Sequence, residues 1–339
     1  MEKPGPKKTY DQFVRAANMD PNYKVSIPWV NLIDATPYLP NYIKYKESLL
    51  TPITNQSDCA SCWAISVCHM IADRIAVYTG GKIKRPLSHQ ELISCWNVKG
   101  DLGCTVGGSP ESALQRVIEH GIATLEDYPY AQANSTDIVP CEQKWLKGFR
   151  TYLQQGSVRS LCQDPDRFPK DSDAYKKVIA KNMQNMKTEL FLNGPFICTI
   201  QVYSNLYDFD GLSVYTKTSG KYVGGHAALV IGMVTGEVDG IEPGFDKNFY
   251  IVKNSWSSKW PIKSPASNGY VYIEAGKNLA GIESRASRAL PVLTDEIRRN
   301  MVTSLNESRY ISYDEYSRDP EKINFVKKST KLRALLRNK

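Results

Sequence analysis

Cys62 lies where a cysteine thiol could act as a nucleophile. It follows Ser61, a residue type common at helix N-caps, and the stretch from Cys62 to Tyr78 contains no Gly or Pro and repeats apolar residues about every 3.6 positions. A thiol in the first helical turn faces the positive end of the helix dipole and unpaired backbone N–H groups, and both favour the reactive thiolate. Gln56, six residues earlier, could point its amide at an oxyanion beside that sulfur. The alternative is an ordinary buried cysteine or a disulfide partner.

His226 is the histidine best suited to serve as the base that a thiolate nucleophile requires. The chain has four histidines; His69 and His120 lie inside helical patterns and His89 begins one, as is typical of ordinary surface or core histidines. His226 instead follows two glycines and precedes an apolar, β-rich run at 227–233. The glycines allow another segment to approach closely, and a strand would hold the imidazole rigidly.

Asn254 lies 28 residues after His226, at the end of another β-rich run at 249–253. Its side-chain oxygen could accept a hydrogen bond from one ring nitrogen of His226 and leave the other nitrogen facing the sulfur. Trp256, two residues later, could shield that bond from water, and a shielded hydrogen bond is stronger. Together with Cys62, these groups could transfer an acyl group through a thioester, and this chemistry implies no metal or organic cofactor.

These segments resemble the active-site motifs of the papain-like cysteine peptidases, and most closely those of the cathepsin B group. The segment that begins at Gln56, Gln-Ser-Asp-Cys-Ala-Ser-Cys-Trp, is similar to the family form Gln-Gly-Ser-Cys-Gly-Ser-Cys-Trp. Gly-Gly-His-Ala around His226 and Asn-Ser-Trp from Asn254 follow in the family's order. The resemblance implies that Cys62 is the nucleophile and His226 the general acid/base. Asn254 would orient His226, and Gln56 with the N–H of Cys62 would form the oxyanion hole.

The resemblance covers roughly residues 28–291 and implies an α+β fold of two lobes. A helical N-terminal lobe and a β-barrel-like C-terminal lobe would enclose the active-site cleft between them, which agrees with the helical patterns of the first half and the β-rich runs of the second. Family pairing further suggests the disulfides Cys59–Cys104 and Cys95–Cys141, the first of which would pin the nucleophile loop.

Substrate-binding residues are predicted at Gly107, Gly108, Trp256 and Arg285. In the family, the second of two glycines pairs with an extended substrate backbone. Arg285 stands where the cathepsin B group has an acid at the base of the S2 pocket, so it could disfavour Arg at P2 and accept acidic residues; an Arg that extends into solvent is the alternative. The divergent segment 131–185 contains no histidine, whereas the cathepsin B group carries a histidine pair on an occluding loop, so endopeptidase action is expected.

The composition is that of an ordinary globular protein, with 339 residues of which 42% are hydrophobic and 23% charged. The net charge of +8 is read as solubility rather than a specific nucleic-acid role. The chain has no apolar run of about 18 residues and no recognisable secretory signal, so no membrane span is expected, and an intracellular or virus-associated protein is favoured over conventional secretion. Eight cysteines, by contrast, favour some disulfides.

The chain is expected to divide into an arm or short pro-segment at 1–27, the peptidase domain at 28–291 with an insertion at 131–185, and a basic extension at 292–339. Lys322–Lys339 carries seven Lys or Arg and no acid, which would allow a weak contact with nucleic acid or an acidic surface; a solvated tail is the alternative. The predicted function is hydrolysis of polypeptides. Acyl transfer to an amine, or a catalytically silent papain-fold binding or structural protein with a basic tail, are the alternatives.

Overall fold

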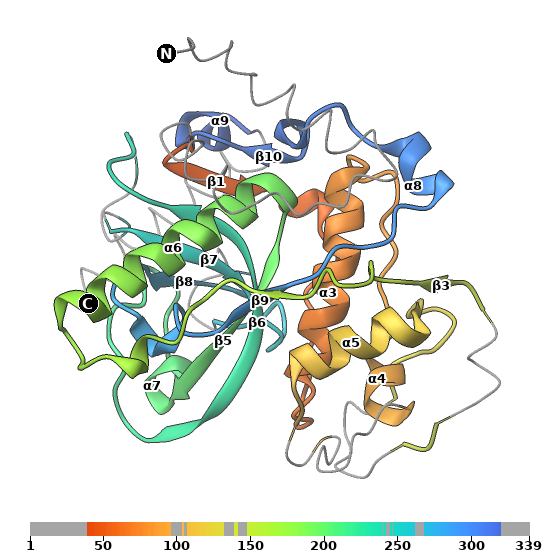
Figure 1. The fold of residues 1–339 in the computed structure, drawn as a ribbon, viewed down its shortest axis with the longest axis horizontal. Helices are drawn as coiled ribbons and strands as arrows, with labels where there is room; N and C mark the ends of the chain where they lie inside the picture. The colour runs from red at the N-terminus through yellow and green to blue at the C-terminus, as the bar shows by residue number, and fades with distance from the viewer. Residues whose placement is uncertain are drawn as a thin grey trace, which may run out of the picture.

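The chain folds into a helical lobe and a lobe built on an antiparallel sheet, the expected α+β arrangement (Figure 1). The computed structural model describes residues 39–95, 104, 107–131, 139–141, 148–239, 241, 245, 247–261 and 268–319. The helical lobe contains α3 (Cys62–Tyr78), α4 (His89–Cys95) and α5 (Pro110–His120). Helix α6 (Asp173–Asn193) packs on the sheet side of the molecule.

The main sheet places the strands that carry His226 and Asn254 next to each other. Its order is β10-β1-β6-β5-β9-β4, with β7 between β6 and β8, and all named pairs are antiparallel. The strands are β1 (Tyr42–Tyr45), β4 (Arg159–Ser160), β5 (Phe196–Tyr203), β6 (Tyr222–Val234), β7 (Phe249–Lys253), β8 (Tyr270–Glu274), β9 (Ala286–Arg288) and β10 (Arg309–Tyr310), while β2 (Ile122–Ala123) and β3 (Arg150–Thr151) form a separate pair. The short helices are η2 (Glu47–Leu49), η4 (Pro165–Arg167), α7 (Ser204–Tyr207), η5 (Leu279–Gly281), α8 (Asp295–Asn300), η6 (Leu305–Ser308) and α9 (Tyr313–Ser317).

Helix α3 begins at Cys62, as its sequence pattern predicts, and is almost wholly buried. Ser61 occupies the N-cap position, as expected. Its side chain makes no capping hydrogen bond, and its hydroxyl lies 3.3 Å from the hydroxyl of Tyr130. The helix ends before Gly80 and Gly81, whose φ angles of 57° and 83° favour glycine. The nucleophile candidate therefore stands at the first turn of the central helix of the protein.

Residues 292–319 pack on the domain and do not extend away from it. Strand β10 joins the sheet beside β1. The hydroxyl of Ser308 donates to the carbonyl of Val77 at 2.6 Å, and the N–H of Val302 donates to the carbonyl of Tyr78 at 2.8 Å. These are carbonyls of the last turn of α3, which a helix cannot satisfy internally. The segment therefore completes the C-terminal end of the helix that begins with Cys62.

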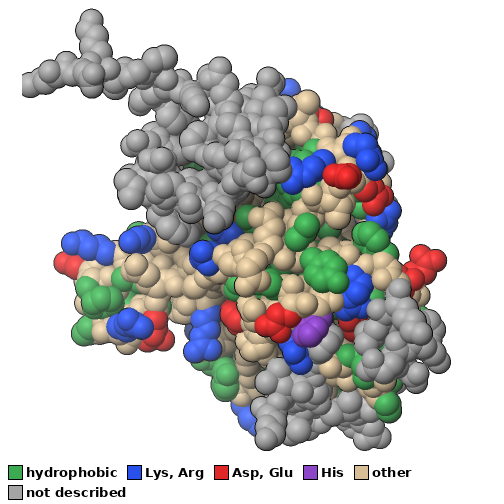
Figure 2. All heavy atoms as spheres, turned by 45° about the vertical axis from the view of Figure 1, so that its right-hand side comes forward, with side chains coloured by type: hydrophobic (Ala, Val, Ile, Leu, Met, Phe, Trp, Pro, Cys, Tyr) green, Lys and Arg blue, Asp and Glu red, His purple; other side chains and the backbone are tan. Residues whose placement is uncertain are grey.

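Two segments singled out in the sequence, 1–27 and Lys322–Lys339, lie outside the described residues. On the face shown in Figure 2, basic and acidic side chains are interspersed with hydrophobic ones. Within the described part of the chain, no helix has both the length and the apolarity required to cross a membrane.

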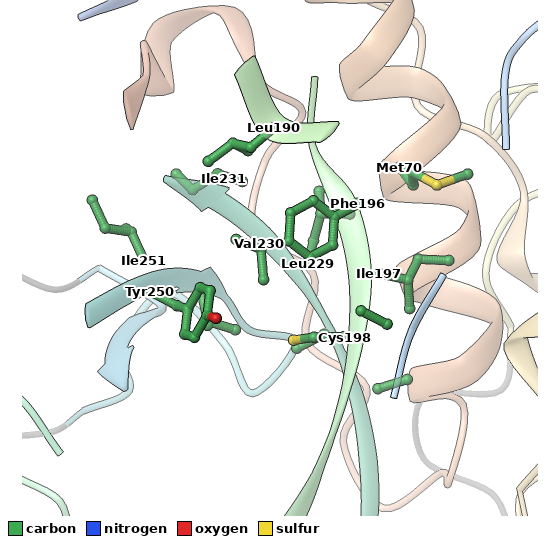
Figure 3. Close-up of a cluster of buried hydrophobic side chains, with 14 of the residues drawn as sticks. Met70, Leu190, Phe196, Ile197, Cys198, Leu229, Val230, Ile231, Tyr250 and Ile251 are labelled. Atoms are coloured by element: carbon green, nitrogen blue, oxygen red, sulfur yellow. The ribbon is translucent and has the colours of Figure 1, made fainter. Parts of the chain in front are cut away.

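The core joins the two lobes. Figure 3 shows part of it, where Phe196 of β5 lies between Met70 of α3 and Val230 of β6. All three side chains are fully buried. Burying such a side chain stabilises the fold by roughly 1.5–3 kcal/mol, so this packing holds α3 firmly against the strand that carries His226.

Candidate active site

Cys62 and His226 face each other across the two lobes and share a hydrogen bond. Burial would raise the pKa of the Cys62 thiol, but the hydrogen bond and charge of His226, helped by the backbone N–H groups of Ala227 and Trp63, lower it overall. Burial would lower the pKa of His226, but its hydrogen bond and charge interaction with Cys62, with a further hydrogen bond to Asn254, raise it overall. The two shifts favour a thiolate beside an imidazolium.

Asn254 is hydrogen-bonded to the imidazole of His226. Nε2 of His226 lies 2.7 Å from Oδ1 of Asn254, which also accepts the N–H of Ser255 at 2.8 Å. Because a carbonyl oxygen only accepts, Nε2 carries the hydrogen and Nδ1 is left for the sulfur. The backbone N–H of Asn254 in turn donates to the carbonyl of Gly269 at 2.9 Å. His226 and Asn254 are 4% and 3% exposed, so water has little access to the bond between them.

Trp256 covers this hydrogen bond as the sequence suggests. Its ring centroid lies 4.8 Å from that of His226. Tyr207 of α7 stacks on the indole at 4.9 Å with 25° between the ring planes, and Trp260 meets it edge-on at 5.0 Å. Tyr207 is 47% exposed and was not among the predicted site residues. The sequence offered one weak indication of Tyr207, which is that an aromatic residue follows shortly after the β-rich run at 196–203.

Gln56 is held by hydrogen bonds from several directions. Its Oε1 accepts the hydroxyl of Ser255 at 2.6 Å, and its Nε2 donates to the carbonyl of Cys59 at 3.0 Å. Its backbone N–H donates to the carbonyl of Ser255 at 2.9 Å, and its carbonyl accepts the hydroxyl of Tyr130 at 3.2 Å. Ser255 and Tyr130 were not predicted as site residues. Ser255 adjoins Asn254 in the sequence, but nothing in the sequence places Tyr130 beside Gln56.

Both suggested disulfides, Cys59–Cys104 and Cys95–Cys141, are present. The first ties the loop before α3 to the segment that carries Gly107 and Gly108. A Cβ atom at Gly108 would lie 2.7 Å from the ring of Trp63, and Gly107 has a φ of 87°. Both positions therefore require glycine for the backbone to pass so close to the first turn of α3.

The remaining free cysteines differ from Cys62. Cys68 and Cys198 are buried and Cys162 is partly buried. Burial raises the pKa of Cys68 well above its ordinary range and raises the pKa values of Cys162 and Cys198 to about 12. Of the four free thiols, Cys62 is the one whose pKa is lowered, so it is the thiol disposed to react at neutral pH.

Arg285 has an exposed side chain, while its backbone carbonyl accepts the N–H of Thr199 at 2.9 Å. Its contact with a P2 residue stays a prediction. In the part of the chain that the structure describes, no group of three or more His, Cys, Asp or Glu is arranged to hold a metal ion.

Comparison with known proteins places this site in a family. The family model described as "Papain family cysteine protease" matches residues 39–290. A gut-specific cysteine proteinase of Caenorhabditis elegans is 31% identical over 232 residues, which are 68% of this chain and 66% of that protein. The cathepsin B-like cysteine proteinase 3 of the same nematode is 30% identical over 68% of this chain and 59% of its own length. The chain thus spans slightly less than two thirds of these relatives.

Among solved structures, proCathepsin B S9 from Trypanosoma congolense superposes with a TM-score of 0.56 at 25% identity, covering 75% of this chain and 78% of that one. The two curated relatives are nematode proteins, and the expectation of an intracellular or virus-associated protein finds no support in these comparisons. The matched region contains Gln56, Cys62, His226 and Asn254. The chain belongs to the papain family of cysteine proteases.

Proposed function

We propose that the protein is a cysteine endopeptidase that hydrolyses polypeptides through a thioester on Cys62. The observation that carries the proposal is the hydrogen-bonded Cys62–His226 pair, in which the thiol pKa is lowered and the imidazole pKa is raised. The Asn254 bond to His226 at 2.7 Å supports the same assignment.

In the first half-reaction, the thiolate of Cys62 attacks the peptide carbonyl carbon and a C–S bond forms. The N–H of Cys62 and the amide of Gln56 stabilise the oxyanion. The imidazolium of His226 gives its proton to the leaving nitrogen, the C–N bond breaks, and an amine departs from the thioester. In the second half-reaction His226 takes a proton from water, the resulting hydroxide adds to the thioester carbonyl, and the carboxylic acid product leaves as the thiolate is restored.

Endopeptidase action is proposed because the segment 131–185 offers no histidine pair to hold a substrate's C-terminal carboxylate. Arg285 is proposed to disfavour Arg at P2, and its exposed side chain is compatible with contact to substrate. Gly107 and Gly108 are proposed to pair with the substrate backbone, because the glycine backbone beside Trp63 carries no side chain that would block an extended peptide.

The test is selective alkylation of the whole chain with dilute iodoacetamide from acidic to mildly alkaline pH, with the labelled site mapped by mass spectrometry. We expect Cys62 to react at acidic pH and His226→Ala to abolish that advantage. A parallel peptide library should be cleaved at internal bonds. If Cys62 reacts no faster than Cys68 or Cys198 at any pH, the proposal fails and a catalytically silent binding protein is favoured. Release of C-terminal dipeptides alone would refute endopeptidase action.

A further inference from the structure

The segment from Thr51 to Gln56, called here the oxyanion arm, delivers the proposed oxyanion donor but belongs to no helix or strand. Its ladder contact is a single bridge between Asn55 and Trp256. Ile53 packs on Gly269, whose carbonyl accepts the N–H of Asn254. A segment without regular structure takes its position from the side chains on either side of it, so those side chains decide where Gln56 lies.

One side of the oxyanion arm is held by helix α3. His69 and Asp73 lie seven and eleven residues after Cys62, spacings that place all three on one helical face. Nε2 of His69 lies 2.9 Å from the hydroxyl of Thr54. Oδ1 of Asp73 accepts both the N–H and the hydroxyl of Thr51 at 2.6 Å. The face of α3 that begins with Cys62 therefore also contacts the oxyanion arm at two residues, Thr51 and Thr54.

The other side of the oxyanion arm is held by Lys253, the residue before Asn254. Its ammonium donates to the carbonyl of Thr51 at 2.7 Å, to the hydroxyl of Thr51 at 2.9 Å and to Oδ2 of Asp73 at 2.8 Å. The side chains of Lys253 and Asp73 are both 0% exposed. Such a pair is tolerated only when further hydrogen bonds satisfy both ions, and Thr51 supplies them. Strand β7, Thr51 and α3 are thus fastened at one place.

We propose that His69 and the Asp73–Lys253 pair are positioning residues that hold the oxyanion arm between α3 and β7 and so set Gln56 and Asn254 around Cys62. The inference rests on the proposed function. His69 acts on Thr54, two residues before Gln56. The ion pair acts at the start of the oxyanion arm and directly beside Asn254. None of the three touches the reacting atoms.

A positioning role can be distinguished from a contribution to folding stability alone, because it should affect peptide hydrolysis and alkylation of Cys62 differently. Alkylation of Cys62 by iodoacetamide needs the thiolate but builds no oxyanion, whereas peptide hydrolysis needs both. His69→Ala should therefore lower kcat roughly tenfold to hundredfold, because small displacements of catalytic groups carry penalties of that size. KM should stay within about twofold, and the rate and pH profile of Cys62 alkylation should match those of the wild type. His69→Gln, whose amide can still reach Thr54, should recover part of kcat.

Asp73→Asn has a matched control in Glu189→Gln. Arg74, the next residue of α3, forms a second buried ion pair with Glu189 at 2.7 Å, but its other bonds go to the carbonyls of Pro195 and Ala289, away from the oxyanion arm. Each substitution turns one buried carboxylate into an amide and leaves its cation in place. Asp73→Asn should lower kcat and also slow alkylation at acidic pH, because Asn254 moves with Lys253. Glu189→Gln should lose stability without either kinetic change.

The experiment measures kcat, KM and Cys62 alkylation on the folded, full-length variants, with kcat expressed per alkylatable Cys62. Thr54→Val removes only the hydroxyl that is hydrogen-bonded to His69. If His69→Ala does not fold, kcat of Thr54→Val therefore tests whether this hydrogen bond positions Gln56. Where both fold, their effects on kcat should not add in the double variant. Wild-type kcat in Thr54→Val and Asp73→Asn would overturn the positioning role and leave the proposed function intact. A wild-type protein without turnover or acid-side alkylation would overturn both.

Discussion

Oδ1 of Asn254 accepts hydrogen bonds from Nε2 of His226 at 2.7 Å and from the N–H of Ser255 at 2.8 Å. The carboxamide cannot rotate without losing the second bond, so the imidazole always presents its other nitrogen to Cys62. The hydrogen bonds of Asn254 thus determine that Nδ1 of His226 is the nitrogen that exchanges a proton with Cys62.

The pH profile of kcat/KM should be bell-shaped and broad, because the Cys62–His226 pair moves the acidic limb to lower pH and the alkaline limb to higher pH. The thiolate forms as pH rises through the lowered pKa of Cys62, and the imidazolium is lost as pH rises through the raised pKa of His226. The active form exists between these two apparent values, which belong to the pair. Asn254→Ala removes a hydrogen bond that raises the His226 pKa, so the alkaline limb should move to lower pH. An unmoved alkaline limb would argue against this assignment.

Ser255→Ala should impair catalysis less than Gln56→Ala. The Ser255 hydroxyl holds Oε1 of Gln56 at 2.6 Å, whereas Gln56 itself is the proposed donor. Loss of one oxyanion donor lowers kcat by about 10²–10³ in a comparable enzyme. Ser255→Ala leaves the donor in place and only displaces it, so we expect it to lower kcat by roughly tenfold to hundredfold, as for His69→Ala. Steady-state kinetics on both variants test the order. Equal losses of kcat would contradict this order and would mean that Gln56 cannot act as a donor without the Ser255 hydroxyl.

Arg285→Glu should admit Arg at P2 and weaken acceptance of acidic P2 residues, because the charge predicted at the base of the S2 pocket changes sign. Profiling P2 with wild type and variant measures kcat/KM for each residue. Identical P2 profiles would show that the exposed Arg285 side chain points away from substrate.

The two disulfides should differ in their effect on catalysis. Replacing either pair by serine should lower the free energy of unfolding by about 2–4 kcal/mol. Only loss of Cys59–Cys104, which anchors the loop between Gln56 and Cys62, should also reduce kcat; loss of Cys95–Cys141 is the matched control. Denaturant unfolding and turnover of the two double variants test this, and a shared drop in kcat would contradict it.

The sequence supported prediction of the helix and strands that carry the candidate site residues, because the local pattern of each is distinctive. Cys62 opens a helix free of Gly and Pro, and His226 and Asn254 adjoin strands with clear β patterns. Both disulfide pairs could also be anticipated, through the family resemblance.

Tertiary contacts were not accessible in this way. His69 has the pattern of an ordinary helical histidine, and only the fold brings Thr54 to it. The Ser61 hydroxyl makes no capping bond to α3 and lies beside the hydroxyl of Tyr130, which only the fold brings there. Strand β10 has two residues, too few for an alternation pattern to reveal its place beside β1.

That last pairing has a consequence for the order of events during synthesis. Strand β1 pairs on one side with β6, which carries His226, and on the other with β10, more than two hundred residues later in the chain. Contacts of such long sequence separation form slowly and cannot form before the distant segment has left the ribosome. The sheet that supports His226 is therefore completed only after Arg309 and Tyr310 emerge, so a nascent chain lacks the finished sheet until that point.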